Sequence, residues 1–125
     1  MRGPHTLTVE ANGAAMKAAR DWVGKIFESW GLDDYLGKLI VTELATNVVK
    51  HTDAEQMIVR VYVADAGPVV EVEDASPVLP VVLPLTEDSF SGRGLAMVEI
   101  FADALGWNAT GDGGKCVWAV LPAVA

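Results

Sequence analysis

The sequence predicts an α+β fold, and three observations favour it. Apolar residues recur at three- and four-residue intervals through two successive stretches in the N-terminal half, as they do in helices. They then alternate with a period of two through two neighbouring stretches, as they do in strands. Like elements therefore follow one another in runs, which favours α+β over a strictly alternating βαβ arrangement. The 125 residues fit one domain, spanning 1–125.

The N-terminal half is expected to hold a short strand and two helices. Residues 6–10, "TLTVE", alternate like a strand. A helix is expected over about 13–30, and Gly31 ends it. The apolar face of this helix consists of Ala19, Trp22, Val23, Ile26, Phe27 and Trp30. Asp33 is a candidate N-cap for a second helix that runs to about His51. The apolar stripe of the second helix consists of Leu36, Leu39, Ile40, Leu44 and Val48.

The C-terminal half is expected to hold a hairpin, a long loop, a helix and a closing strand. Residues 57–64 and 69–74 read as strands joined through "DAGP", which suits an antiparallel hairpin. Residues 75–91 contain three prolines and neither period, so we expect a loop, of the length that often forms a functional lid or a disordered segment. "GRGLAMVEIFADAL" (92–105) then resumes a helix, and "KCVWAVL" (115–121) closes the chain as a strand.

Composition excludes several classes of protein. The formal net charge is -8, and the nine cations are scattered instead of forming the basic stripe that a phosphate backbone requires, so we expect no direct nucleic-acid binding. The single cysteine, Cys116, excludes an internal disulfide and a multi-cysteine zinc site. The N-terminus has no apolar core of signal-peptide length, and no run elsewhere reaches the roughly 18 apolar residues of a membrane span. We therefore expect a soluble cytoplasmic domain without membrane contact.

Four polar side chains interrupt the second expected helix, in the stretch "ELATNVVKH". Glu43, Asn47 and His51 lie four residues apart on one edge of the helix, and Lys50 lies beside them. Glutamate can act as a base, an amide oxygen can bind Mg²⁺, and a lysine can contact phosphate. The alternative is an exposed polar edge of an amphipathic helix. His51 also suits the negative end of the helix dipole, which is its simplest role.

Two further stretches could contact a ligand. Asp74 ends an expected strand, where its carboxylate could accept a hydrogen bond from an exocyclic amine while Ser76 leaves room for a flat ring. Asp74 could instead cap a turn. Gly92 and Gly94, in "SGRGLAM", precede a helix whose free N–H groups suit phosphate, although glycines also make ordinary turns. "GDGGKCVW" reads as a glycine turn and strand, which could be a simple hairpin.

Taken together, these stretches resemble the ATP-binding fold shared by gyrase, histidine kinases and MutL, known as the Bergerat or GHKL fold. "ELATNVVKH" looks like its N box, "EDASP" like its first glycine-box aspartate, "SGRGL" like its second glycine box and "GGKCVWAVLP" like its last box. The resemblance covers about residues 5–122. The "DASPVLP" form of the first box and the short length look most like bacterial anti-sigma-factor serine kinases of the RsbW class.

The resemblance implies a role for each matching residue. Asn47 would hold Mg²⁺ that bridges the phosphates of ATP, Glu43 would orient or deprotonate the attacking hydroxyl, and Lys50 would touch phosphate. Asp74 would read the adenine amino group, with Ser76 beside the ring.

The two later boxes imply the remaining roles. Gly92 and Gly94 would let a lid close over the triphosphate, with Arg93 and Leu95 of the same box close to the nucleotide. Cys116 would stand near adenine, at a place often filled by threonine, and its thiol would be a weaker hydrogen-bond partner there.

The resemblance also implies the architecture and the function. We expect a two-layer α/β sandwich, with a mixed, mainly antiparallel sheet covered by helices on one face. The implied reaction is transfer of the γ-phosphoryl group of ATP to a Ser or Thr of an antagonist protein of the STAS type, in a switch that controls a sigma factor. The alternative is a nucleotide-responsive module that binds its partner without phosphorylating it. Exposed edges of Trp22 and Trp30 could form a homodimer or partner surface, although both are most simply core residues.

Overall fold

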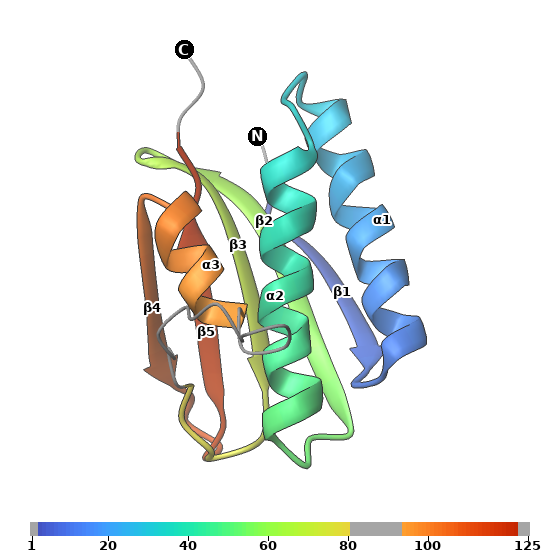
Figure 1. Ribbon diagram of the computed structural model, residues 1–125, viewed down its shortest axis with the longest axis vertical. Coiled ribbons are helices and arrows are strands. Elements are labelled where there is room, and N and C mark those ends of the chain that lie inside the picture. The colour runs from blue at the N-terminus through green and yellow to red at the C-terminus, as the bar shows by residue number, and fades with distance from the viewer. Residues whose placement is uncertain (1–2, 81–93, 123–125) are drawn as a thin grey trace, which may run out of the picture.

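In the described part of the chain, three helices cover one face of a five-stranded sheet (Figure 1). The computed structural model describes residues 3–80 and 94–122. Its elements, in chain order, are β1 (His5–Glu10), α1 (Gly13–Ser29), α2 (Tyr35–His51), β2 (Gln56–Ala64), β3 (Gly67–Asp74), α3 (Gly94–Phe101), β4 (Ala104–Ala109) and β5 (Lys115–Val120). The predicted α+β class, with helices on one face of the sheet, is confirmed.

The sheet has the strand order β1-β2-β3-β5-β4, and each neighbouring pair is antiparallel. The sheet is therefore antiparallel rather than mixed within the described residues. Strands β2 and β3 form the expected hairpin, in which Ala64 pairs with Gly67 across a two-residue turn. Strand β5 lies between β3 and β4, so the end of the chain occupies an interior position of the sheet.

The helix ends follow local side-chain chemistry. Asn12 caps α1, because its Oδ1 accepts a hydrogen bond from the Ala15 N–H at 2.9 Å. Gly31 follows α1 with a φ of 74°, a conformation that favours glycine. The expected N-cap of α2, Asp33, lies one residue too early, because Asp34 holds that position. Asp33 still accepts a hydrogen bond from the Tyr35 N–H at 2.7 Å and so helps to begin the helix.

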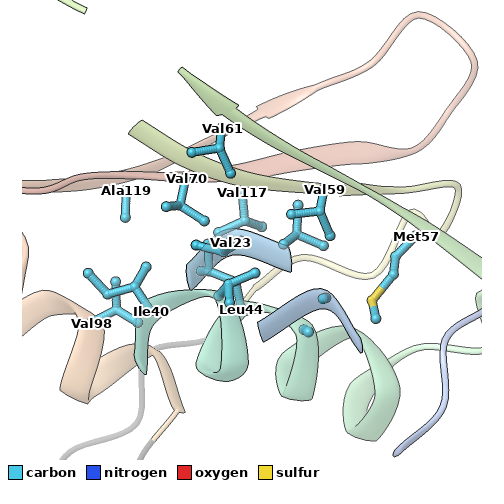
Figure 2. Packing of buried hydrophobic residues seen from close by; sticks show 14 of the residues in the cluster. Val23, Ile40, Leu44, Met57, Val59, Val61, Val70, Val98, Val117 and Ala119 are labelled. Carbon is cyan, nitrogen blue, oxygen red and sulfur yellow. The ribbon is translucent and has the colours of Figure 1, made fainter. Parts of the chain in front are cut away.

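The core fills the space between the sheet and the helices (Figure 2). Alternate residues of the central strands point toward the helices, as the period of two requires. They are Val59, Val61, Val70, Val72, Val117 and Ala119, and each is at most 4% exposed. Residues of all three helices meet them, including Val23, Ile40, Leu44 and Val98. Trp22 and Trp30 are partly buried against this cluster, which supports their interpretation as core residues.

The predicted helix over 92–105 extends too far. Helix α3 ends at Phe101, and the chain from Ala104 onward forms β4 instead. The turn is held by a hydrogen bond from the Asp103 N–H to the Val120 carbonyl oxygen at 2.8 Å. Pairing with β5 satisfies the backbone groups of this segment, and local periodicity carries no information about that distant partner.

Candidate functional site

The predicted site residues come from four elements that approach one another at one end of the molecule. Figure 1 shows the C-terminal half of α2, the end of β3, the start of β5 and the N-terminus of α3 in the lower half of the view. Helix α2 packs against both β3 and α3. Because β3 and β5 are antiparallel, the last residue of β3 pairs with the first residue of β5, so Asp74 lies opposite Lys115.

Helix α2 presents its polar residues on the side away from α1. A Cβ atom built on Gly24 of α1 would meet the Lys38 side chain, so Lys38 marks the side of α2 that faces α1. At roughly 100° per residue, Asn47 lies on the opposite side of the helix from Lys38. Glu43 lies one turn before Asn47, and its side chain is partly buried. The edge of α2 that carries Glu43 and Asn47 therefore borders the space beside α3.

Asn47 is not the exposed helix residue that the alternative interpretation requires. It is 8% exposed, yet no hydrogen bond within the described part of the chain uses its side-chain amide. Its amide is not among the fully buried atoms left without a partner in the described residues, so it can meet a ligand at this edge of α2. Lys50 and His51, in contrast, are more accessible in the last turn of α2, where positive charge favours the helix dipole.

Asp74 is 4% exposed at the end of β3, and its two oxygens have different surroundings. Oδ1 accepts hydrogen bonds from the Ser76 N–H at 2.8 Å and from the Lys115 Nζ at 3.0 Å. Oδ2 has no hydrogen bond within the described residues, although Lys115 Nζ lies 3.0 Å away in an ion pair. The proposed turn-capping role thus applies to Oδ1, while Oδ2 is a buried acceptor that a ligand donor could satisfy.

Ser76 stabilises the backbone that follows Asp74. It is 7% exposed, and its Oγ accepts a hydrogen bond from the Val78 N–H at 3.1 Å. Its own carbonyl oxygen lies 3.4 Å from Lys115 Nζ. The segment after β3 is therefore tied to both Asp74 and Lys115.

Sequence reasoning missed Lys115, which is 1% exposed and is the cation of the only buried ion pair among the described residues. Two signals could have revealed it. Lys115, Val117 and Ala119 are alternate residues of one strand, so they point to the same face of the sheet. Lys115 also directly follows a glycine pair at the start of the strand. A Cβ atom on Gly114 would clash with the Asp74 backbone, so the absence of a side chain at 114 lets β3 and β5 approach closely here.

The structure corrects the predicted position of Cys116 near adenine. It faces the side of the sheet that carries no helix, because alternate residues of β5 point to opposite faces and its neighbours Lys115 and Val117 are the buried ones. Burial, and then the carboxylate of Glu71, raise the pKa of the Cys116 thiol to about 12. Cys116 therefore cannot contact a group bound at Asp74, and Lys115 is the residue of β5 that does face Asp74.

The comparisons with known proteins agree with this arrangement. Residues 9–121 match the family described as histidine kinase-like ATPase domain. The chain belongs to that family. The predicted GHKL superfamily is thereby confirmed.

A solved structure supports the same fold for the ATPase domain. The crystal structure of the RsbU and RsbW domains of a Mycobacterium tuberculosis protein matches with a TM-score of 0.69 at 18% sequence identity. The match covers 96% of this chain and 32% of the other, so this chain spans about a third of that protein's length. A search of curated proteins finds no significant match.

The glycine-rich part of the ATPase domain is only partly described. Gly92 and Arg93 lie outside the described residues, as do residues 81–91 of the expected lid. Gly94 begins α3, which places the free N–H groups of that helix at the same end of the molecule as Asp74. The Leu95 side chain is 3% exposed within the core cluster, so any contact with a nucleotide would use its backbone N–H.

Two of the hollows formed by the described residues lie near opposite ends of α2. One, of about 360 Å³, is lined by the end of α1, the start of α2 and Leu121, and it contains no predicted site residue. The other, of about 600 Å³, is lined by residues 53–56 and 75–78 and so includes Ser76. The first is more enclosed and more apolar, but only the second adjoins the Asp74 end of the sheet.

Two searches of the described residues gave negative results. They contain no group of three His, Cys, Asp or Glu side chains that could hold a metal ion by themselves. No helix in the described part of the chain is long and apolar enough to cross a membrane.

Proposed function

We propose that this domain binds ATP with Mg²⁺ and transfers the γ-phosphoryl group to a Ser or Thr of a STAS-type antagonist protein, in a switch that controls a sigma factor. The observation that carries the nucleotide part is the unsatisfied Oδ2 of Asp74, a buried acceptor at the end of β3. An exocyclic amine is the donor that such an acceptor suits. Because the chain belongs to the ATPase family, the ligand that carries this amine would be an adenine nucleotide.

The residues of α2 suit the phosphate end of the ligand. Asn47 lies on α2, which packs against α3, and it would bind Mg²⁺ through its amide oxygen. The metal would supply charge neutralisation to the phosphates. Lys50, at the exposed end of α2, would contact a phosphate oxygen, and the N–H groups at the start of α3 would favour the negative charge.

Glu43 would act as the base in the transfer step. The hydroxyl oxygen of the acceptor attacks the γ-phosphorus while the bond from that phosphorus to the bridging oxygen breaks, so that ADP leaves with the electron pair. The hydroxyl proton passes to the Glu43 carboxylate. This reaction depends mainly on positioning and charge neutralisation, so a base, a held cation and helix N–H groups are sufficient.

The regulatory part of the proposal has separate support. The structural relative contains a domain named RsbW together with one named RsbU. The net charge of -8 disfavours direct contact with nucleic acid, which suits a regulator that acts through a protein such as a sigma factor. A cytoplasmic location would follow from that partner.

The test combines nucleotide binding with phosphoryl transfer. Purified protein is titrated with ATP by calorimetry, with Mg²⁺ and with excess chelator, and is then incubated with radiolabelled ATP and purified candidate STAS-domain antagonists. We expect Mg²⁺-dependent binding of ATP and label on one antagonist. Glu43→Gln should keep ATP binding and reduce single-turnover transfer by roughly a hundred- to ten-thousand-fold. Glu28→Gln, at an exposed position of α1, is the matched control and should change neither.

Each failure has a distinct meaning. Absence of heat with any adenine nucleotide would reject the proposed site. Binding without label transfer to any antagonist would favour the alternative, a nucleotide-responsive module that sequesters its partner. Undiminished transfer by Glu43→Gln would reject Glu43 as the base.

A further inference from the structure

The two edges of the described sheet differ in how their side chains protect them. Strand β1 forms one edge; it follows Pro4 and carries the exposed, charged Glu10. Strand β4, with the sequence "ALGWNA", forms the other edge and contains neither a charged residue nor a proline. Figure 1 shows β4 at the left of the sheet, beside α3. Natural proteins guard their sheet edges with charges, prolines or bulges, so the unguarded edge of β4 is suited to pairing with another strand.

The backbone of β4 presents free hydrogen-bonding groups along this edge. The Thr110 N–H donates to the Gly114 carbonyl oxygen at 3.0 Å, so these residues form a hydrogen-bonded pair of the β4–β5 ladder. Hydrogen-bonded and non-hydrogen-bonded pairs alternate along an antiparallel ladder. The N–H and C=O groups of Leu105, Trp107 and Ala109 therefore point away from β5, and no other described strand pairs with β4. Another extended backbone fits such a row of donors and acceptors.

Exposed apolar side chains lie beside this free backbone. Trp107 pairs with Val117, which is buried beneath the helices, so the Trp107 side chain lies on the helix side of the sheet. It is nevertheless 43% exposed. Ile100 and Phe101, at the end of α3, are 60% and 40% exposed, and α3 packs against β4. A strand added to this edge would meet apolar side chains on its helix side, so its alternate residues should be apolar.

The charges around β4 indicate which kind of partner fits. Among residues 94–122, Glu99, Asp103 and Asp112 are exposed, whereas Lys115, the only cation, is buried against Asp74. Asp103 and Asp112 stand just before and just after β4. If β4 paired antiparallel with β4 of a second copy, these acidic ends would meet, and each copy also carries a net charge of -8. Complementary charge therefore favours a basic partner over a second copy.

We propose that the β4 edge, together with the exposed end of α3, is a docking surface for an extended segment of another protein. The segment adds to the described sheet as a further strand, with apolar residues at alternate positions and lysine or arginine at its ends. Main-chain hydrogen bonds to Leu105, Trp107 and Ala109 supply affinity, while the apolar and charged contacts supply specificity. None of these residues except Leu105 neighbours a residue assigned to phosphoryl transfer in sequence or function, so the surface stands independently of the proposed function.

A synthetic peptide tests the surface directly. It has six central residues that alternate between valine and threonine, two lysines at each end and a fluorescein label, and fluorescence anisotropy measures its binding. We expect saturable binding to the wild-type chain that weakens as salt is added. Two control peptides should bind at least about tenfold more weakly. One carries glutamates in place of the lysines and meets like charge, and the other is N-methylated at all six central residues and lacks the N–H donors.

Two variants remove separate parts of the surface. Ala109→Pro removes an N–H that points away from β5, so it blocks strand addition while sparing the ladder. Trp107→Ala removes an exposed apolar side chain. Each should weaken binding of the lysine peptide about tenfold. The matched controls are Ala109→Ser, which keeps the N–H, and Tyr35→Ala, which removes an exposed aromatic ring at the start of α2; both should keep the wild-type affinity. Urea unfolding shows whether each variant is folded.

Amide hydrogen exchange, measured by NMR, shows where the peptide lies. In the free protein the amides of Gly106 and Asn108, which pair with β5, should exchange slowly. The amides of Leu105, Trp107 and Ala109 should exchange quickly. A saturating concentration of the lysine peptide should slow exchange of this second set about tenfold or more, because each amide then donates to the added strand.

Several results would overturn the proposal. Absence of peptide binding to the wild type is one, and binding that survives N-methylation is another, because charge alone would then explain it. Unchanged amide exchange at Leu105, Trp107 and Ala109 in the complex would place the peptide elsewhere. A wild-type dimer in sedimentation equilibrium that Ala109→Pro converts to a monomer would show that a second copy occupies the edge. If Ala109→Pro does not fold, Trp107→Ala and the N-methylated peptide decide the matter.

Discussion

Replacing Gly114 by alanine tests whether the close approach of β3 and β5 builds the Asp74 end of the site. A Cβ atom at this position would lie 2.8 Å from Ala75 Cα and 3.1 Å from the Asp74 carbonyl carbon, and nearer still to the Asp74 carbonyl oxygen. These are backbone atoms, so no side-chain rotation can relieve the contact. Ordinary contacts begin at 3.4 Å, so the two strand ends must separate by at least about 0.6 Å, taking 2.8 Å from 3.4 Å.

The expected cost has two parts. Overpacking of this kind costs about 1–3 kcal/mol. Separation of the strands also weakens the contact of Lys115 with Asp74, which is buried and cannot be replaced by water without loss. We therefore expect Gly114→Ala to lower the free energy of unfolding by about 2–4 kcal/mol, a large share of the total stability of a small domain.

Two other glycines of the same turn provide controls. Nothing lies within 4 Å of a Cβ atom built on Gly111, so Gly111→Ala should change the free energy of unfolding by no more than about 0.5 kcal/mol. Gly113 has a φ of 92°, so Gly113→Ala meets no neighbour but strains the backbone, at a cost of about 1–2 kcal/mol.

Urea unfolding, followed by tryptophan fluorescence, measures all three variants. The expected order of stability is Gly111→Ala, then Gly113→Ala, then Gly114→Ala, with a midpoint for the last that is roughly 1–2 M below that of the wild type. If Gly114→Ala were as stable as Gly111→Ala, the strand ends would not be packed as described. The placement of Asp74 beside Lys115 would then be wrong as well.

Two further predictions concern Cys116 and Asn12. Burial raises the pKa of Cys116 to about 12 from an ordinary value of 9.0, so the folded protein holds this proton more tightly than the unfolded chain does. The contribution of the protonated thiol to stability is therefore full below about pH 9 and is lost as the pH rises toward 12. Iodoacetamide at pH 8 should therefore label the unfolded chain much faster than the folded one, and equal rates would show that the thiol is open to solvent. Asn12→Ala should lower the free energy of unfolding by about 1 kcal/mol, because it removes the acceptor for the Ala15 N–H. Asn12→Ser should retain most of that stability, because serine also caps helices. Equal urea midpoints for Asn12→Ala and the wild type would reject the cap.

The sequence was sufficient for the elements whose signals are local. The three- and four-residue spacing placed α1 and α2 to within a few residues, and it placed Glu43 and Asn47 on one edge of α2. Alternation placed β2 and β3 to within about two residues, because successive side chains of a strand point to opposite faces. The connection through 65–68 was predicted two residues too long, since Ala64 pairs with Gly67. Asp74 could be proposed as a site residue because it ends the predicted strand and is followed by small residues and a proline.

The tertiary structure decided what depends on distant partners. Almost every residue of "KCVWAVL" is apolar, so alternation in this segment could not tell which face meets the helices. The resemblance placed Cys116 near adenine, whereas the structure turns it to the face without helices. The strand β4 exists because β5 supplies its hydrogen bonds, although its first residues continue a helical pattern. The pairing of Asp74 with Lys115 joins residues 41 positions apart through the register of two strands. Register is set by the packing of the whole sheet against the helices, and no local stretch of the sequence contains that information.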